Sequence, residues 1–187
     1  MHDPLAPDNK VPGNAAHVHL DKTTERAKRA WLTRRRNAQQ QVTMKCLSVR
    51  QPWANAIFMA GKDVENRAYR RKYRGPLLIH ASLQIDSAPT TGPPAKRLQS
   101  VTAGPMPTGA IIGVVRLLDV VENSRSKWAE PDKWHWLLAE PQLLAEPITC
   151  AGKLGIFEVE IPLGALKKAL PKARAELYTL KKGPVGK

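Results

Sequence analysis

Residues 47–67 contain two polar clusters of the types that ligand binding and catalysis require. The segment reads LSVRQPWANAIFMAGKDVENR, with RQPW at 50–53 followed by Lys62, Glu65 and Arg67. A cation, a carboxylate and a second cation within six positions can bind a polar ligand or take part in proton transfer. The apolar residues between the clusters recur at helical spacing, and a helix would hold one cluster at each end. We therefore treat this segment as the candidate site.

The charged residues of the candidate site suggest two kinds of chemistry. A lysine shielded from water loses part of its preference for the charged form, so Lys62 could act as a base. Glu65 works in the opposite direction, because a nearby carboxylate keeps Lys62 charged and able to stabilise an oxyanion or hold a phosphate. Arg50 and Arg67 offer forked donors for a phosphate or a base carbonyl. The alternative without function is a simple surface ion pair between Lys62 and Glu65.

Five further residues are candidates for ligand or RNA binding. Trp53 offers a stacking face for a nucleobase, although its place on the apolar stripe favours packing in the core. Gln51 belongs to the first polar cluster, and Arg70 and Arg71 lie in a basic loop interleaved with tyrosines. His80 follows a buried run, which favours a hydrogen-bonded structural histidine over a residue that faces a cleft.

The elements that must position these residues are one helix and several short strands. Pro52 suits the first turn of a helix and Gly61 its end, and residues 63–67 are expected to be extended. Residues 86–108 are dominated by Pro, Gly, Ser and Thr, which predicts a long loop, either mobile or functional. Apolar runs and alternation predict strands near 46–49 and at 77–82, 110–121, 134–144 (with a turn at Pro141) and 154–162.

The order of these elements indicates the fold class and the domain organisation. Short strands with one early helix and no βαβ alternation predict an α+β fold, a small mixed β-barrel with an adjacent short helix. Residues 1–43 are expected to be a basic extension, disordered over 1–20 and marginally helical over 21–41. Residues 44–162 form the predicted domain, and residues 163–187 a short or broken helix with a loose tail.

The charge of the chain favours a polyanionic partner. The 187 residues carry a net charge of +14 and a pI of about 10.1. Residues 44–187 alone carry 22 Lys and Arg against 12 Asp and Glu, a net charge of +10. A field of this size favours nucleic acid, and the alternative is a solvated basic surface.

Several classes of protein are disfavoured by the same inspection. No apolar run approaches the roughly 18 residues that span a bilayer, and the N-terminus has no secretory signal. Cys46 and Cys150 lie far apart without ligand spacing, so we expect reduced thiols in a cytoplasmic protein and no metal. The sequence has no Ser-His-Asp, P-loop or dinucleotide motif, and we expect no cofactor.

Four segments together resemble a known family. The order LSVRQPWA, GKDVENR, YRGPLLIHAS and CAGKLGIFEVEI is similar to that of an ASCH domain of the PUA-like superfamily, over roughly residues 44–162. The resemblance implies a small β-barrel with a helix beside a cleft, and the segment from Gly61 to Arg67 takes the place of the cleft-lining motif. This segment has one residue fewer between glycine and lysine than many relatives have. The superfamily is associated with RNA binding and modified-nucleoside recognition.

The resemblance also implies possible activities. Some small members are amidohydrolases that act on acetylated cytidine with a lysine, a threonine and a glutamate. Lys62 matches the lysine, but Glu65 occupies the threonine position, and either Glu122 or Glu130 is a candidate for the third position. The leading hypothesis is therefore an RNA- or nucleoside-binding module. The alternatives are a hydrolase of modified nucleosides or RNA that uses Lys62 and Glu65, and a protein-interaction module that docks through its N-terminal helix.

Overall fold

The computed structural model describes residues 22–89 and 91–169, which form two units divided between Arg35 and Arg36. Helix α1 (Lys22–Gln39) is the basic N-terminal helix that the sequence predicted. Its two large apolar side chains in the first unit, Trp31 and Leu32, are both half exposed, in keeping with the lack of a core-facing stripe. The predictions made for residues 1–20 and for the tail after Gly183 lie outside the described residues.

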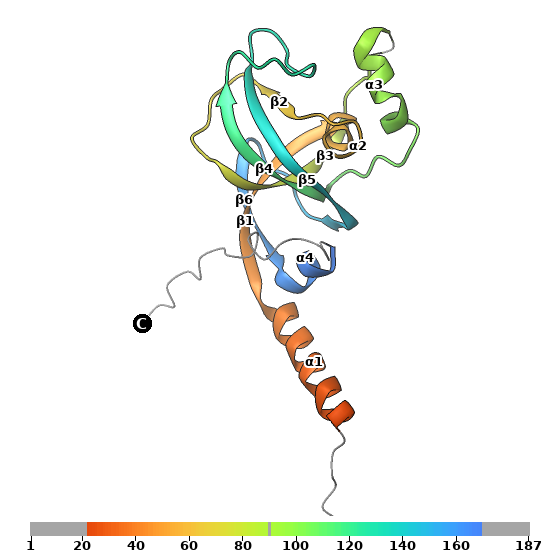
Figure 1. Cartoon of the computed structure of the whole chain (residues 1–187), viewed down its shortest axis with the longest axis vertical. Helices are drawn as coiled ribbons and strands as arrows, with labels where there is room; N and C mark the ends of the chain where they lie inside the picture. Colours follow the sequence, from red (N-terminus) through yellow and green to blue (C-terminus); the bar gives the residue numbers. More distant parts are fainter. Residues whose placement is uncertain (1–21, 90, 170–187) are drawn as a thin grey trace, which may run out of the picture. The chain divides into compact units, whose positions relative to one another are not determined.

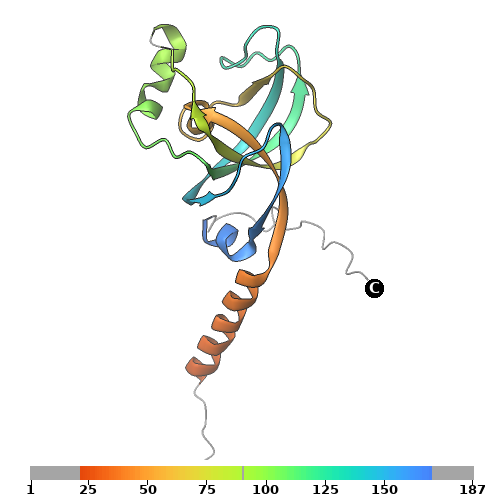
Figure 2. The same cartoon turned by 180° about the vertical axis from the view of Figure 1, so that it is seen from behind.

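The second unit is built on a six-stranded mixed sheet (Figure 1). The strands are β1 (Gln41–Gln51), β2 (Val64–Arg67), β3 (Gly75–Ile85), β4 (Ala110–Val121), β5 (Trp134–Thr149) and β6 (Ile156–Pro162), paired in the order β2-β5-β4-β3-β1-β6. The β1–β3 pair is parallel and the other four pairs are antiparallel. The view from behind shows β1 beside β6 (Figure 2). The α+β class is confirmed, and closure of the sheet into a barrel stays a prediction.

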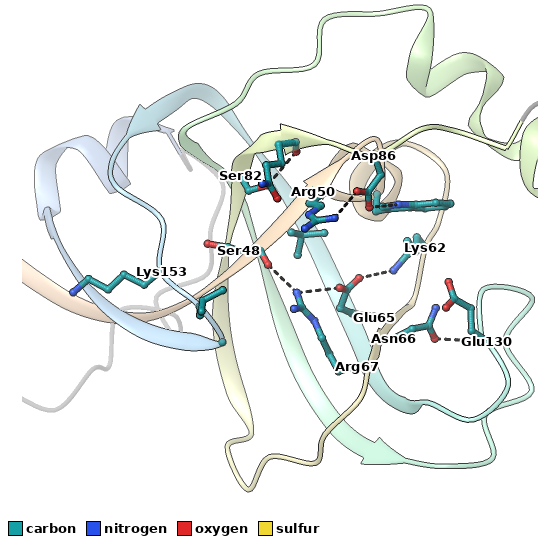
Figure 3. Close-up of a pocket in the computed structure, with 15 residues that line it drawn as sticks. Ser48, Arg50, Lys62, Glu65, Asn66, Arg67, Ser82, Asp86, Glu130 and Lys153 are labelled. Atoms are coloured by element: carbon teal, nitrogen blue, oxygen red, sulfur yellow. Dashed lines mark hydrogen bonds and ion pairs between the residues drawn. The ribbon is translucent and has the colours of Figure 1, made fainter.

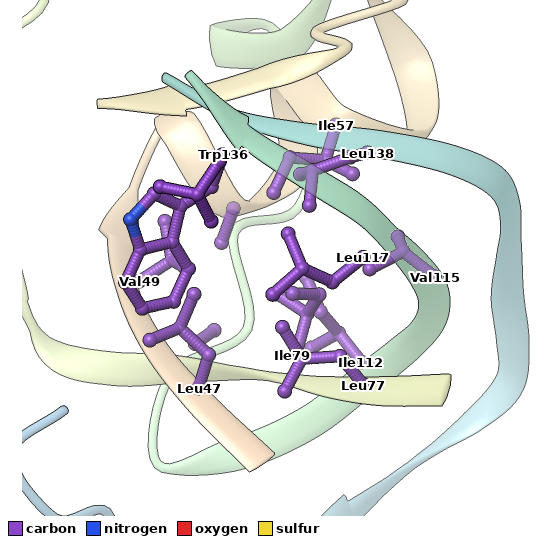
Figure 4. Close-up of a cluster of buried hydrophobic side chains, with 13 residues drawn as sticks. Leu47, Val49, Ile57, Leu77, Ile79, Ile112, Val115, Leu117, Trp136 and Leu138 are labelled. Carbon is purple, nitrogen blue, oxygen red and sulfur yellow. The ribbon is translucent and has the colours of Figure 1, made fainter. Parts of the chain in front are cut away.

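Buried side chains lie on both faces of the central strand β4. Ile112 and Val115 pack in one cluster with Trp136, which is fully buried (Figure 4). Ile111 and Val114 pack in a second cluster, on β1, β3, β5, β6 and α4. Burial on both faces explains why β4 reads as a continuous apolar run rather than as an alternating pattern.

The predicted loop at 86–108 contains a helix, which corrects the sequence prediction. Helix α3 (Gly92–Thr102) has Thr91 as its N-cap residue and proline in its first turn, where a missing N–H costs nothing. Its Leu98 and Val101 are buried against α2 (Trp53–Met59) and Trp128. The Pro and Gly residues that suggested a loop therefore mark the two ends of a helix, and its two apolar contacts supplied too little periodicity to reveal it.

The predicted end of a strand at Pro141 is also wrong, because β5 continues to Thr149. Glu140 has a positive φ of 52°, and the register between β4 and β5 shifts at this point. An irregularity of this kind accommodates a proline, which has no N–H for the ladder. Helix α4 (Leu163–Ala169) confirms the helix predicted after residue 162, as far as the described residues extend.

Candidate functional site

A cleft of about 410 Å³ opens where α2, β2 and the ends of β1 and β3 meet (Figure 3). Its wall is mainly polar and draws on segments far apart in the sequence. The lining residues are Ser48, Val49, Arg50, Trp53, Lys62, Glu65, Asn66, Arg67, Ser82, Gln84, Asp86, Glu130, Lys153, Leu154 and Gly155.

Lys62, Glu65 and Arg67 form an ion triad in the wall of the cleft (Figure 3). Lys62 Nζ lies 2.7 Å from Glu65 Oε2, and Arg67 Nη2 lies 3.1 Å from Glu65 Oε1. The exposed fractions of the three side chains are 4%, 9% and 22%. Lys62 also donates to the carbonyl of Val64 at 2.5 Å, and Arg67 to the carbonyl of Ser48 at 2.8 Å. The buried carboxylate is thus neutralised by two cations, each held by a backbone acceptor.

The local sequence explains how the triad is presented. Gly61 has a φ of 62°, and the N–H of Lys62 donates to the carbonyl of Ala56, which ends α2 with a tight turn. The chain then enters β2, where side chains alternate between the two faces. Val64 is buried in the cluster with Leu98, while Glu65 lines the cleft. The period of two therefore puts Glu65 and Arg67 on the cleft side of β2, and the turn at Gly61 brings Lys62 beside Glu65.

Asp86 holds a second group of cleft residues that the sequence analysis only partly identified. Its Oδ1 lies 2.8 Å from Nη1 of Arg50, and its Oδ2 accepts a hydrogen bond from the indole N–H of Trp53 at 3.2 Å. The backbone N–H of Asp86 donates to the carbonyl of Gln51 at 2.7 Å. Trp53 is half-buried and packs against the core while it lines the cleft. Asp86 was missed because nothing in the sequence distinguishes it from other polar residues after a strand.

Two charged side chains of the wall have no hydrogen-bond or ion-pair partner among the described residues. One is the carboxylate of Glu130, whose own backbone N–H donates to Asn66 Oδ1 at 3.2 Å. The other is Lys153, whose side chain extends away from Arg67 at the outer part of the cleft (Figure 3). Glu130 was one of the two acidic candidates from the family resemblance, and Glu122 does not line the cleft. Lys153 was missed by the sequence analysis.

Four predicted binding residues lie outside the cleft lining. Gln51 is fully buried and bonds to Asn55 and to the carbonyl of Pro107. His80 is 1% exposed. Its Nδ1 lies 3.2 Å from Ser48 Oγ and its Nε2 lies 3.1 Å from the carbonyl of Cys150, which is the structural role that the sequence favoured. The remaining two are Arg70 and Arg71, which lie over the rings of Trp134 and Tyr69.

Neither metal-binding groups nor membrane-spanning helices are found in the described part of the chain. Within residues 22–89 and 91–169, no three His, Cys, Asp or Glu side chains are grouped so that they could hold a metal ion. In the same ranges, no helix is both long enough and apolar enough to cross a bilayer.

A comparison of the sequence with models of protein families identifies the family of this chain. The model of the ASCH domain matches residues 47–154, more than half of the chain. The chain belongs to the ASCH domain family. This family is part of the PUA-like superfamily. The matched range contains every lining residue of the cleft except Gly155. No curated protein matches the chain.

Proposed function

We propose that this ASCH domain binds RNA or modified nucleosides in the cleft around Lys62, Glu65 and Arg67. The observation that carries the proposal is the ion triad, which presents fixed donors in a partly enclosed polar cleft. Arg67 is only partly satisfied, because its Nε is buried and has no hydrogen-bond partner among the described residues. The Arg67 side chain is also 22% exposed and lines the cleft, where its accessible N–H groups can donate to a phosphate oxygen or a base carbonyl.

The surroundings of the triad suit a nucleotide better than a small inorganic anion. Trp53 lines the same cleft, and its indole is fixed by the hydrogen bond to Asp86. A fixed aromatic face can stack on any nucleobase, while cations bind the sugar–phosphate part. The net charge of +10 over residues 44–187 supports an anionic ligand independently of the cleft.

Ligand binding with variants of the triad tests the proposal. The full chain is titrated with nucleosides, including acetylated cytidine, and with short single-stranded RNAs at several salt concentrations. We expect Lys62→Ala and Arg67→Ala, each of which leaves Glu65 with one cation, to weaken binding at least tenfold while circular dichroism shows a folded protein. RNA binding should also weaken as salt rises.

A matched control separates the cleft from general charge. Lys45→Ala/Lys168→Ala removes two cations that pair with Glu158 and Glu146 outside the cleft. We expect this variant to bind almost as the parent does. Full-strength binding by the folded triad variants, or RNA binding without salt dependence, would contradict the proposal.

A hydrolase is the second candidate, and the unpaired carboxylate of Glu130 favours it. Both oxygens of Glu65 face cations, so Glu65 is a poor choice to take a proton from water. Glu130 lines the same cleft as Lys62 and has no partner among the described residues. A free carboxylate can act as a general base, while a lysine ammonium stabilises the developing oxyanion.

Product formation tests the second candidate. The chain is incubated with acetylated cytidine and, separately, with single-stranded RNA. Hydrolysis should depend on Glu130, so Glu130→Gln should lower its rate by about a hundredfold or more. If no product forms, or if Glu130→Gln and Lys62→Ala react at the parental rate, the cleft is a binding site only.

A further inference from the structure

Three cations lie on the two loops that approach each other at Gly155, at the edge of the cleft. We infer that Arg70, Arg71 and Lys153, here called the basic band, hold phosphates next to the nucleotide in the cleft. The ligand is then a single-stranded polynucleotide rather than a free nucleoside. This inference rests on the proposed function and names the ligand class for the same site.

The two arginines of the basic band are held by aromatic rings. The guanidinium carbon of Arg71 lies 4.5 Å from the ring centroid of Tyr69, and that of Arg70 lies 5.7 Å from the ring centroid of Trp134. Tyr69 is itself fixed, because its ring meets that of the buried Trp136 edge to face at 5.8 Å. A guanidinium held over a ring keeps its N–H edges available for phosphate oxygens and loses little freedom on binding.

The cations of the basic band have no carboxylate within ion-pair distance in the part of the chain that the structure describes. One acid that Arg70 attracts, Asp119, is paired with Arg74 at 2.7 Å. Arg70 adds a weaker attraction, and together the two arginines hold the pKa of Asp119 below its usual value. Some partly exposed cations of the second unit, such as Lys45 and Arg116, are by contrast paired with glutamates. Other exposed cations, among them Lys72, Lys96 and Lys133, also have no ion pair among the described residues. The basic band is distinguished by its place on the loops beside the cleft and by the aromatic rings that hold its arginines.

The basic band continues into the cleft through the loop at 150–155. A β-carbon on Gly155 would lie 3.5 Å from the hydroxyl of Tyr69 and 3.7 Å from Nη2 of Arg71, so the two loops are in contact. Gly155 and Lys153 both line the cleft. Leu154, between them, is fully exposed and offers an apolar surface to a base. A polynucleotide that leaves the cleft past Gly155 would run between the loop that carries Lys153 and the loop that carries Arg71.

This arrangement favours a polynucleotide over other anionic partners. A free nucleoside has no phosphates for cations outside the cleft. An acidic protein or an anionic membrane would match the charge, but neither accounts for a nucleotide-sized polar cleft that continues into the basic band. Single strands combine separate phosphate and base contacts, which is the combination that the cleft and the basic band provide.

Comparing a mononucleotide with an oligonucleotide tests the inference. The full chain is titrated with a labelled single-stranded RNA of about eight nucleotides and with the corresponding mononucleotide. We expect Arg70→Gln/Arg71→Gln/Lys153→Gln to weaken RNA binding tenfold or more. The slope of log affinity against log salt should become shallower by about 2, since each phosphate contact on a single strand contributes about 0.7. Arg70→Gln/Arg71→Gln, which changes only residues outside the cleft lining, should alter mononucleotide affinity less than twofold.

Two further variants show whether RNA binding depends on the position and the side-chain shape of these cations rather than on total charge. Lys45→Gln/Arg116→Gln/Lys168→Gln removes three paired cations elsewhere and should leave most of the RNA affinity and the salt slope in place. Arg70→Lys/Arg71→Lys keeps the charge without the planar fork, and should retain the salt slope while losing part of the affinity. Thermal melting of each variant shows whether it is folded.

The outcomes separate this inference from the proposed function. If the mononucleotide binds as tightly as the RNA and the basic-band variant changes neither, the inference is overturned while the cleft keeps its role. If the triad variants bind both ligands like the parent, the proposed function itself fails. If vesicles with anionic phospholipids bind through the basic band as tightly as the RNA does, the assignment to a polynucleotide is wrong.

Discussion

Arg50 and Asp86 form an ion pair across 36 positions of sequence, with 2.8 Å between Nη1 and Oδ1, in the wall of the cleft. The second oxygen of the same carboxylate accepts the indole N–H of Trp53. Asp86 therefore fixes both a cation and an aromatic ring. It also occupies a donor of Arg50 that an anionic ligand would use, so the carboxylate and the ligand compete for one guanidinium.

Replacing Asp86 with asparagine should increase the affinity for anionic nucleotides. In Asp86→Asn, the amide oxygen would remain as an acceptor for Trp53, while the loss of the negative charge would release Arg50. Partly exposed ion pairs are worth at most about 1 kcal/mol, so we expect a gain of about two- to fivefold. Mononucleotide titration at low salt measures the gain.

Two controls distinguish release of Arg50 from a general change in charge. Glu130→Gln removes one negative charge from the same cleft without releasing an arginine, and should give a smaller gain. In an Arg50→Ala background, Asp86→Asn should give no more than the small gain expected for Glu130→Gln. If Asp86→Asn raised the mononucleotide affinity equally with and without Arg50, Asp86 would not compete with the ligand for this guanidinium.

Removing Glu65 should destabilise the fold more than removing Lys62. Glu65→Ala leaves Lys62, which is 4% exposed, with a backbone carbonyl as its remaining acceptor. Loss of one partner from a buried pair costs about 3–5 kcal/mol. Lys62→Met costs less, because Glu65 keeps its ion pair with Arg67 and the apolar chain fills the space. Urea unfolding measures both free energies, and equal losses would argue against shared neutralisation by two cations.

Gly152 should not tolerate a side chain. A β-carbon there would lie 2.5 Å from Cε1 of His80 and 2.9 Å from Ser48 Oγ, closer than atoms pack. Gly152→Ala should therefore cost about 1–3 kcal/mol and shift the loop that carries Lys153. Gly104 has no atom within 4 Å of the equivalent position, so Gly104→Ala is the matched control and should change stability by less than about 1 kcal/mol. Thermal melting of the two variants gives the comparison.

Alkaline conditions should destabilise the protein partly through Cys46. Burial raises the pKa of this thiol far above its ordinary value, and the neighbouring Cys150 adds to the shift. Above about pH 8.5 the unfolded chain loses this proton and the folded chain keeps it. Stability then falls with pH by up to about 1.4 kcal/mol per unit for one thiol. The loss is absent at neutral pH, where both states are protonated.

Urea unfolding at several pH values between about 8 and 10 measures this slope. Cys46→Ala should make the slope shallower, whatever its effect on stability at neutral pH. Burial also raises the pKa of Tyr73 and Cys150, so part of the slope should remain. An unchanged slope in Cys46→Ala would show that the buried thiol does not contribute.

Local patterns sufficed for the elements that carry the triad. Pro52 and Gly61 mark the ends of one helix, and the alternation after Gly61 places Val64 in the core and Glu65 on the cleft. The continuous apolar run at 110–121 likewise predicted β4, because both faces of this strand are buried. Helix α3 was not predicted, because only its Leu98 and Val101 are buried and the segment is rich in residues typical of turns.

The sequence by itself determined the family, the strands and helix that flank the candidate site, and the proximity of Lys62 to Glu65, because these depend on residues close together in the chain. Tertiary structure alone decided that Asp86 pairs with Arg50, that Glu130 and Lys153 join the cleft, and that His80 bonds to Ser48 and to the carbonyl of Cys150. These relationships join segments far apart in the sequence through strand pairing and packing. The helical and strand periodicities of a sequence depend only on neighbouring residues, so they do not indicate which distant charges lie close together in the folded chain.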